Sequence, residues 1–272
     1  MSFAEGLAAF DDVSFESGSL YTFSEWYDVD YAGYMAEDGF YRMLVTQQAA
    51  NDGLLVEYGA GTGRLCLGYL GEGARVHAVE PCAEMLERLL EKARAMDLAP
   101  GRLSAENTTA DAFVDVKDGA ADLVTFPFNG LLHITSHEEL RAVLRRSYCA
   151  LRKGGVFAID ITTPSWDAMS RGLTPWGRVD ERVHPRTGEK VLTCDSSRYD
   201  PASRILTTDF RFLVEGEPQG MELRIEQFMW ATQEIRTLVE EEGFSSQFLF
   251  GDVDFSPFKE SSSRMLLSAL KA

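Results

Sequence analysis

The hydrophobic pattern of the chain changes its period from one region to the next. Between residues 54 and 161, short apolar runs alternate with segments whose apolar positions recur every three or four residues, as at Leu86, Leu89 and Ala93. Short apolar runs are typical of buried strands, and the longer period is typical of amphipathic helices. This alternation predicts parallel strands that are joined by crossover helices.

The flanking regions have different patterns. Residues 20–50 are rich in aromatic and acidic residues and predict a helical lead-in. Residues 165–230 alternate polar and apolar positions between turn-rich segments, which predicts a meander of three or four antiparallel strands. The earlier pattern then returns, with a predicted helix at 232–243 and two strands at 246–250 and 264–271. The meander is therefore predicted to be inserted within one α/β domain.

These patterns predict three parts of the chain. Residues 1–50 form a helical lead-in, and residues 165–230 form the inserted meander. Residues 51–164 and 231–272 together form the doubly wound α/β domain.

Local signals predict where two of the helices begin and end. Ser136 and Glu139 match a capping box, and Gly154 suits the C-terminal exit of the same helix. Thr232 and Gly243 are the corresponding N-cap and exit of the helix that follows the meander.

Composition limits the classes of partner. The chain has 43 acidic and 26 basic residues and a formal net charge of -17, and its Lys and Arg residues are scattered. Duplex nucleic acid and anionic membranes would repel such a chain, so we expect a small molecule or another protein as partner. Its apolar content of 45% is ample for a buried core. Without a signal-peptide pattern or an apolar run of about eighteen residues, the sequence predicts a cytoplasmic protein.

The four cysteines, Cys66, Cys82, Cys149 and Cys194, lie far apart in the sequence. They form no C-x-x-C pair and have no nearby histidine at the spacing of metal ligands. The sequence therefore predicts free thiols and no metal site.

The segment LLVEYGAGTGRLCLGYL, residues 54–70, joins a predicted strand to a predicted helix through three closely spaced glycines. Gly59, Gly61 and Gly63 give G-x-G-x-G, whereas the dinucleotide fingerprint is G-x-G-x-x-G, and Arg64 occupies the position of its third glycine. No Gly-Lys-Ser/Thr follows the turn, which excludes a Walker-type phosphate loop. The turn therefore predicts a nucleotide-like ligand without a pyrophosphate.

Two carboxylates accompany this turn. Glu57 ends the strand just before Gly59, where a negative charge is unfavourable beside a phosphate and favourable beside an ammonium or sulfonium group. Glu80 ends the next strand, about twenty residues after the glycines, where a carboxylate can accept both hydroxyl groups of a ribose. Together these features predict an adenosine ligand with a cationic tail.

At these residues the sequence resembles the class I S-adenosylmethionine-dependent methyltransferases. Four motifs occur in the order of that superfamily: VEYGAGTGR, HAVEPCAEML, ADLVTFPFNGLLHI and LRKGGVFAIDI. The resemblance covers residues 50–165 and implies a Rossmann-like, seven-stranded and mostly parallel sheet that binds S-adenosylmethionine. The meander, FNGLLHI and the ending LFGDVDFSPF further resemble small-molecule methyltransferases, including amino-sugar N-methyltransferases and relatives of glycine N-methyltransferase.

The resemblance implies roles for further residues. Met85 would pack against the adenine, and Asp111 would contact the adenine amino group. Tyr27 and Tyr31 would belong to a lid over the methionine end of the cofactor. Core packing is the alternative for Met85 and both tyrosines, and a solvated loop position is the alternative for Asp111. The predicted cofactor-binding set is Tyr27, Tyr31, Glu57, Gly59, Ala60, Gly61, Gly63, Glu80, Pro81, Met85, Asp111, Ala112 and Phe126.

His133 and Asn129 are the catalytic candidates. Both follow the predicted fourth strand, where acceptors lie in the superfamily, and the resemblance to amino-sugar enzymes implies a histidine beside the acceptor amine. Methyl transfer from a sulfonium is an in-line displacement, so alignment and desolvation carry much of the rate, and a base only removes a proton from the acceptor. A histidine that titrates near neutral pH suits that task, although a structural histidine is the alternative.

The sequence therefore predicts a methyltransferase acting on nitrogen or oxygen of a small-molecule acceptor, with the meander on the acceptor side. Two other functions stay open. A non-catalytic S-adenosylmethionine-binding or interaction module would keep the pocket and bind the cofactor without turnover. A nucleotide-dependent oxidoreductase is disfavoured by Arg64 and would require nicotinamide binding.

Overall fold

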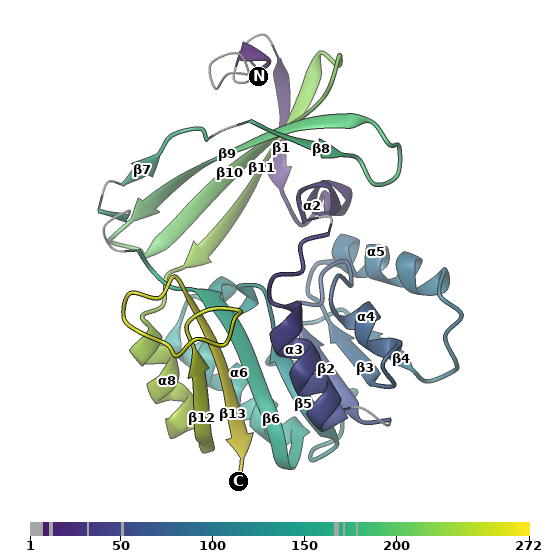
Figure 1. Cartoon of the computed structure of the whole chain (residues 1–272), viewed down its shortest axis with the longest axis vertical. Coiled ribbons are helices and arrows are strands. Elements are labelled where there is room, and N and C mark those ends of the chain that lie inside the picture. Colours follow the sequence, from purple (N-terminus) through teal and green to yellow (C-terminus); the bar gives the residue numbers. More distant parts are fainter. Residues whose placement is uncertain are drawn as a thin grey trace. The chain divides into compact units, whose positions relative to one another are not determined.

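The computed structural model describes residues 8–10, 13–31, 33–49, 52–165, 169–170, 172–177 and 179–272. The chain forms two compact units (Figure 1). Met1–Tyr34 and Ser165–Phe228 make up one, which we call the meander unit, and Met35–Pro164 and Met229–Ala272 make up the other, the α/β unit. The chain passes between the units after Tyr34, Pro164 and Phe228, and the domain boundaries drawn from the sequence stay predictions.

The α/β unit contains a seven-stranded sheet in the order β12-β13-β6-β5-β2-β3-β4 (Figure 1). Strands β2 to β6 pair in parallel, whereas β13 runs antiparallel to both β6 and β12. This arrangement confirms the predicted α/β fold with a doubly wound, mostly parallel sheet. The strands are β2 (Leu54–Tyr58), β3 (Arg75–Val79), β4 (Leu103–Glu106), β5 (Ala121–Phe126), β6 (Leu151–Thr162), β12 (Phe244–Phe250) and β13 (Arg264–Lys271).

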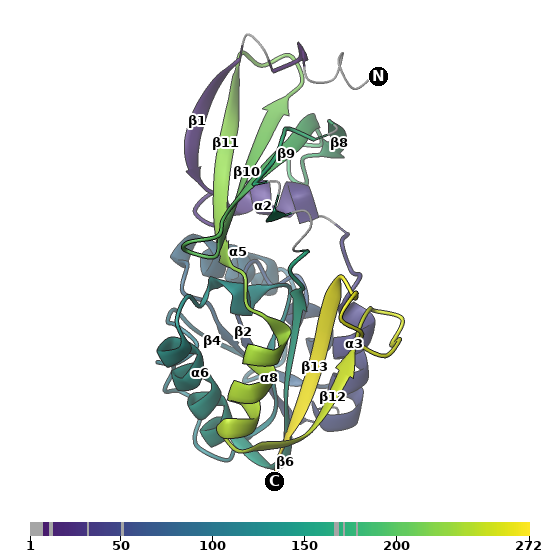
Figure 2. The same ribbon diagram turned by 90° about the vertical axis from the view of Figure 1, so that its left-hand side faces the viewer.

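Helices cover both faces of this sheet (Figure 2). On one face, α3, α4 and α5 pack over a core that includes Leu55, Leu89 and Leu123. On the other face lie α6 and α8, where Tyr58 of β2 contacts Ser147 of α6 through their hydroxyl groups. The helices are α3 (Asp38–Leu44), the π-helix η1 (Val45–Ala49), α4 (Cys66–Leu70), α5 (Ala83–Arg94), the 3-10 helix η2 (Gly130–His133), α6 (His137–Ala150) and α8 (Thr232–Glu241).

The predicted helix ends are correct at one end of α6 and wrong at the other. The Ser136 hydroxyl accepts a hydrogen bond from the Glu139 backbone N–H at 3.2 Å, as the capping box predicts. However, α6 ends at Ala150, and Gly154 lies within β6 with φ +73. The helix ends early because Leu151 already pairs with Ala121 of β5, and the register between these strands then shifts. Similarly, the N-cap of α8 is Ala231, not Thr232.

The meander unit contains a six-stranded sheet in the order β1-β11-β10-β9-β7, with β8 also paired to β9. The antiparallel strands β9, β10 and β11 form the meander that the alternating pattern predicts. Helix α2 packs on one face of this sheet, where Val29 joins a core with Phe210 and Phe212. The elements are β1 (Ser14–Ser19), α2 (Ser24–Tyr31), β7 (Leu173–Thr174), β8 (Asp180–Val183), β9 (Lys190–Asp200), β10 (Ile205–Val214) and β11 (Gln219–Phe228).

Strand β1 was not predicted from the sequence. Its residues, SFESGS, carry a single large apolar side chain and no alternating hydrophobic face. The segment is a strand because its backbone pairs in parallel with β11 along its whole length. Context, rather than propensity, decides such short polar strands. The helical lead-in is seen in α2, α3 and η1, as the pattern of residues 20–50 predicts.

Candidate functional site

The three-glycine turn follows β2 and leads into α4. Gly59, Gly61 and Gly63 have φ values of +58, +55 and +82, in the left-handed region that favours glycine. A Cβ atom on Gly63 would lie 2.7 Å from Leu67 Cδ1 and 3.0 Å from Leu89 Cγ. Gly63 therefore permits the close packing of helices that the dinucleotide fingerprint assigns to a glycine one position later.

This turn lies where the strand order of the sheet reverses. From β2 the chain continues to β3 and β4 on one side and then crosses to β5 on the other. A crevice outside the carboxyl ends of the strands at such a switch point is the usual ligand site of an open α/β sheet. A Cβ atom on Gly59 would lie 3.3 Å from the Phe126 ring at the end of β5, so glycine permits the close approach of the turn to this strand.

Glu80 follows β3 and joins the turn to the start of α5. One carboxylate oxygen accepts the Gly61 N–H at 2.8 Å, and the other accepts the Cys82 N–H at 2.9 Å. Burial raises the pKa of Glu80, and these two hydrogen bonds lower it. Each oxygen has a further lone pair, so the carboxylate fits the predicted role of accepting ribose hydroxyls.

Three buried acids lie beside the turn, and we call Glu37, Glu57 and Asp160 the acid cluster. Glu57 of β2 shares a strand face with Leu55, and Asp160 of β6 shares one with Ala158, because alternate residues of a strand point the same way. Leu55 and Ala158 both pack on the α3–α4–α5 side of the sheet. Glu37 immediately precedes α3, and the exposed fractions of the three acids are 0%, 2% and 1%.

Arg64 is a cation paired directly with this cluster. Its guanidinium forms an ion pair with Glu37 and lies over the Phe128 ring, 4.4 Å from the ring centroid. The pKa of Glu57 is raised to about 8, because burial outweighs the lowering by Arg64 and by hydrogen bonds from Cys66. Arg64 therefore does more than interrupt the dinucleotide fingerprint, because it compensates part of a buried negative charge.

Asp160 holds the segment that follows β5. One of its carboxylate oxygens accepts the Tyr41 hydroxyl at 2.8 Å and the Phe128 N–H at 2.7 Å. Phe128 and Asn129 have φ values of +53 and +61, which are uncommon for residues other than glycine. Burial and, to a smaller extent, the nearby Glu37 raise the pKa of Asp160 to about 6. The strained segment is thus fixed by a buried acid.

The acid cluster fits a cationic cofactor. The Glu37 Oε2 atom is buried and has no hydrogen-bond partner among the residues that the structure describes. A buried carboxylate oxygen without a partner is costly, and a cation or a donor group would relieve that cost. Phosphate groups would meet like charges here. The site therefore suits a sulfonium-bearing or ammonium-bearing adenosine better than a dinucleotide.

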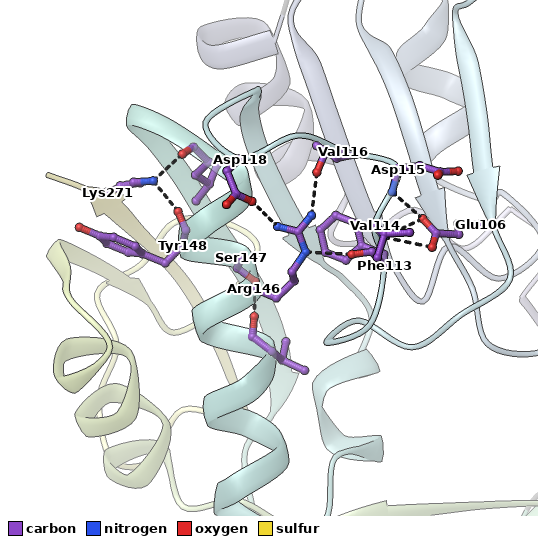
Figure 3. A network of polar contacts seen from close by, with 12 residues as sticks. Glu106, Phe113, Val114, Asp115, Val116, Asp118, Arg146, Ser147, Tyr148 and Lys271 are labelled. Atoms are coloured by element: carbon purple, nitrogen blue, oxygen red, sulfur yellow. Dashed lines mark hydrogen bonds and ion pairs between the residues drawn. The ribbon is translucent and has the colours of Figure 1, made fainter.

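The loop after β4 carries the predicted adenine contacts Asp111 and Ala112, which are both exposed. Glu106 holds this loop at one end, because its carboxylate accepts the N–H groups of Val114 and Asp115 at 3.1 and 3.2 Å (Figure 3). The loop is therefore anchored from the end of β4.

Arg146 of α6 holds the same loop from the other side (Figure 3). Its guanidinium donates to the carbonyl oxygens of Phe113 and Val116 at 2.9 and 2.7 Å and to Asp118 at 3.0 Å. The guanidinium carbon also lies 4.1 Å from the centroid of the Phe113 ring. Sequence reasoning missed this anchor, since an arginine on an amphipathic helix resembles any solvated residue.

The other predicted cofactor residues differ in burial. Ala60, Met85 and Phe126 are buried, with exposed fractions of 5%, 1% and 7%, whereas Pro81 is exposed. Asn107 reaches back from the loop after β4 and donates to the carbonyl oxygens of Glu80 and Pro81 at 2.8 and 3.1 Å. The roles of these residues toward the adenosine stay predictions.

The two catalytic candidates lie just after β5. The Asn129 side-chain oxygen accepts a hydrogen bond from the Thr162 N–H, and the Asn129 backbone N–H donates to the Asp160 carbonyl oxygen at 3.1 Å. Both of these contacts hold the local backbone in place. His133 is the last residue of η2 and is exposed. Both catalytic roles stay predictions.

Tyr27 and Tyr31 lie on α2 in the meander unit, with their ring centroids 4.7 Å apart. Both rings pack against the core that contains Phe210 and Phe212. This packing is the alternative that the sequence left open, and their place in a cofactor lid stays a prediction.

Glu37 and Asp160 were not singled out from the sequence. Asp160 had a detectable signal, because it is a carboxylate inside the apolar run VFAIDI. Glu37 had none, since it is one of several acids in an acidic segment. Only the tertiary structure brings it to Arg64.

Three further observations concern the cysteines, membrane-spanning helices and metal sites. All four cysteines are free thiols. No helix in the described part of the chain is long and apolar enough to cross a membrane. Within those same residues, no group of three or more His, Cys, Asp or Glu side chains is arranged to hold a metal ion.

Comparison with known proteins gives one family match. Residues 55–155 match the family described as "Methyltransferase domain". No curated protein matches the sequence.

Solved structures match over nearly the whole chain. The CcbJ methyltransferase of Streptomyces caelestis has a TM-score of 0.71 and 20% identity, covering 90% of this chain and 96% of that one. DesVI of Streptomyces venezuelae has a TM-score of 0.70 and 16% identity, covering 92% and 97%. CalS10 of Micromonospora echinaspora, with S-adenosylmethionine bound, has a TM-score of 0.63 and 20% identity, covering 91% and 97%. At these identities the similarity is one of fold.

The matched family covers the glycine turn, Glu80 and β5, and the fold extends the match to both ends of the sheet. The site also fits the cation that distinguishes S-adenosylmethionine from other adenosine cofactors. Residues 55–155 therefore match a methyltransferase domain, and the chain has the fold of solved S-adenosylmethionine-dependent methyltransferases.

Proposed function

We propose that the protein transfers a methyl group from S-adenosylmethionine to a nitrogen or oxygen atom of a small-molecule acceptor that carries amino or hydroxyl groups, such as an amino sugar. The observation that carries this proposal is the buried acid cluster at the switch point of a methyltransferase sheet. The acceptor class is supported by structural neighbours, because CalS10 is described as an amino pentose methyltransferase and KedS8 as a sugar N-methyltransferase.

The proposed division of labour follows from the contacts. The glycine turn offers backbone to the cofactor, Glu80 offers carboxylate oxygens to the ribose, and the acid cluster favours the positive charge. When bound, the cofactor supplies a methyl group on a sulfonium that is already a good leaving group. The protein therefore contributes mainly alignment and exclusion of water.

A base is required only where the acceptor must lose a proton. His133 is exposed at the end of η2, beside the segment that Asp160 holds, and an imidazole can accept a proton near neutral pH. We propose that His133 accepts this proton. Asn129 would act by holding the segment in place, since its side-chain oxygen already binds the Thr162 N–H.

Two measurements test the proposal. Isothermal titration should show that the full chain binds both S-adenosylmethionine and its demethylated product, and absence of both would overturn the proposed function. An acceptor panel of amino sugars and matched hydroxyl sugars, read by mass increase, should then show methylation. Binding without transfer to any acceptor would favour a non-catalytic module. His133→Ala with unchanged turnover would remove only the proposed base, and Glu138→Gln, an exposed neighbour on α6, is the matched control.

A further inference from the structure

The acid cluster is only partly neutralised by the cations around it. Arg64 pairs with Glu37, and Arg264 of β13 lowers the pKa of Asp160, yet Glu37 Oε2 has no hydrogen-bond partner within the described residues. All three acids are at least 98% buried, since their exposed fractions are 0%, 2% and 1%. Most buried polar groups in proteins are hydrogen-bonded, so this unpaired carboxylate oxygen calls for an explanation.

Glu37 is the member that links the other two acids. Burial is the largest cause of the raised pKa values of Glu57 and Asp160, and the charge of Glu37 raises both further. The negative charge of Glu37 therefore acts at the carboxyl end of β2, where the glycine turn begins, and at the carboxyl end of β6. Removing the charge of Glu37 changes the electrostatic potential over the whole crevice.

Charge is one property by which a protein can discriminate between the cofactor and its product. S-adenosylmethionine and S-adenosylhomocysteine share the adenine, ribose and amino-acid groups, and they differ by one methyl group and one positive charge at sulfur. Contacts to the shared groups bind both ligands equally, so they cannot separate them. A buried negative potential near the sulfur favours the cationic form alone.

We propose that Glu37, by neutralising Arg64, is a specificity-determining residue, which lets the acid cluster select the cationic cofactor over its neutral demethylated product. This inference rests on the proposed cofactor site. By favouring the sulfonium, the cluster would reduce product inhibition without any contact that is specific to the methyl group. Glu37 would act through its charge and not as a catalytic residue.

The test compares the dissociation constants of three ligands for the wild-type chain and for Glu37→Gln. The ligands are S-adenosylmethionine, the neutral S-adenosylhomocysteine, and sinefungin, whose amine gives a positive charge near the position of the sulfur. Unit charges on the order of 10 Å apart at an effective dielectric constant of about 20 change an affinity roughly tenfold. We expect both cationic ligands to bind about tenfold more weakly to the variant, and the neutral ligand to change by about twofold or less.

A charge-matched variant separates electrostatics from packing. Glu37→Gln leaves Arg64 without its ion-pair partner, whereas Glu37→Gln with Arg64→Gln restores the net charge of the site. We expect the double variant to recover most of the preference for cationic ligands. Glu91→Gln, an exposed acid on α5, is the control and should leave all three constants unchanged.

A measurement on the wild-type chain needs no variant. At pH 7.5 a cation that enters the cluster should displace protons from acids whose pKa burial has raised. Titrations in buffers of different ionisation enthalpy should show release of roughly half a proton more with S-adenosylmethionine than with S-adenosylhomocysteine. The titratable and charged groups around the cluster are Asp38, Tyr41, Arg64, Cys66, Tyr69 and Arg264.

Each result of these binding and proton-release measurements has a single interpretation. A tenfold loss of the preference for cationic ligands in Glu37→Gln, with recovery in the double variant, supports the inference. A folded Glu37→Gln protein with an unchanged ratio of affinities overturns it, as does equal proton release with both ligands. If the wild-type chain binds neither the cofactor nor its product, the proposed function fails, and that result is distinct from the failure of this inference.

Discussion

Two polar regions of the α/β unit use the same residue types and differ in how completely their charges are paired. Around Arg146, the guanidinium donates to two carbonyl oxygens and one carboxylate (Figure 3). Around Arg64, the guanidinium meets Glu37, while Glu57 and Asp160 add two further buried acids. The first region is a closed network that fixes a loop. The second contains two acids whose pKa values are raised by burial and which have no ion pair of their own among the described residues.

This difference has a physical reason. A satisfied network lowers the free energy of the fold, and no ligand is needed to complete it. An excess of buried carboxylates costs stability, and a fold tolerates that cost where a ligand of opposite charge completes the site. The contrast therefore separates residues that hold the site in shape from residues that we propose interact with the cofactor's charge.

The largest expected effect comes from removing the cation of the acid cluster. Arg64→Met should lower the free energy of unfolding by about 4 kcal/mol at pH 8, because Glu37 would then be a buried charge without its partner. At pH 5 the loss should be smaller, since Glu57 and Asp160 are then mostly protonated. Urea denaturation at both pH values measures this, and equal losses would contradict it.

The pH dependence of wild-type stability is the next largest effect. Burial raises the pKa of Glu57 from 4.5 to about 8 and that of Asp160 from 3.8 to about 6. The folded state therefore binds more protons than the unfolded state between these values, and stability falls as pH rises. We expect a decrease on the order of 3 kcal/mol from pH 6 to pH 8.5.

Thermal unfolding across this pH range checks that decrease. Glu57→Gln should flatten the profile above pH 6, because it removes the group with the higher pKa. A wild-type protein whose stability rises with pH in this window would contradict the interpretation of the cluster.

Disrupting the hydrogen bonds of Arg146 should lower the free energy of unfolding by less than disrupting the acid cluster. Arg146→Ala removes three hydrogen bonds and a ring contact, and we expect a loss of about 2 kcal/mol that varies little between pH 5 and pH 8. It should also speed backbone hydrogen exchange in residues 113–118. Arg146→Lys, which keeps the positive charge but not the forked set of N–H donors, should recover only part of the lost stability.

The smallest effect is expected from the donor to Asp160. Tyr41→Phe removes one hydrogen bond to this acid and should cost about 1 kcal/mol at pH 8. The cost should be smaller at pH 5, because a neutral carboxyl group depends less on a donor. The same variant should raise the pKa of Asp160, which NMR titration of its side-chain carboxyl carbon can follow.

How much was predictable differs between elements. The helix α5 was found from its apolar spacing, and its Glu84 in the first turn and Lys92 and Arg94 in the last agree with the helix dipole. The strand β1 was missed because its six residues have no hydrophobic alternation, and pairing with β11 alone makes it a strand. Periodicity reports burial, so an element that is stabilised by backbone pairing leaves no such signal.

The candidate site also contains residues that the sequence predicts and residues that it does not. Glu80 was predicted from its distance to the glycines, because both lie at the carboxyl ends of adjacent parallel strands. The position of Gly154 was misjudged, because the pairing of Leu151 with Ala121 ends the helix before a local signal can. Glu37 could not be found from the sequence, since its contact with Arg64 joins positions 27 residues apart, with two helices, a strand and a turn between them.

The sequence by itself determined the order of strands and helices, the glycine turn and the class of cofactor, because each depends on residues that are close in the chain or on a repeating period. The tertiary structure decided which charges are buried together. It brought Glu37, Glu57 and Asp160 from a helix start and two strands to one face of the sheet, beside Arg64. Charge balance depends on distances between segments that are remote in sequence, and folding alone sets those distances.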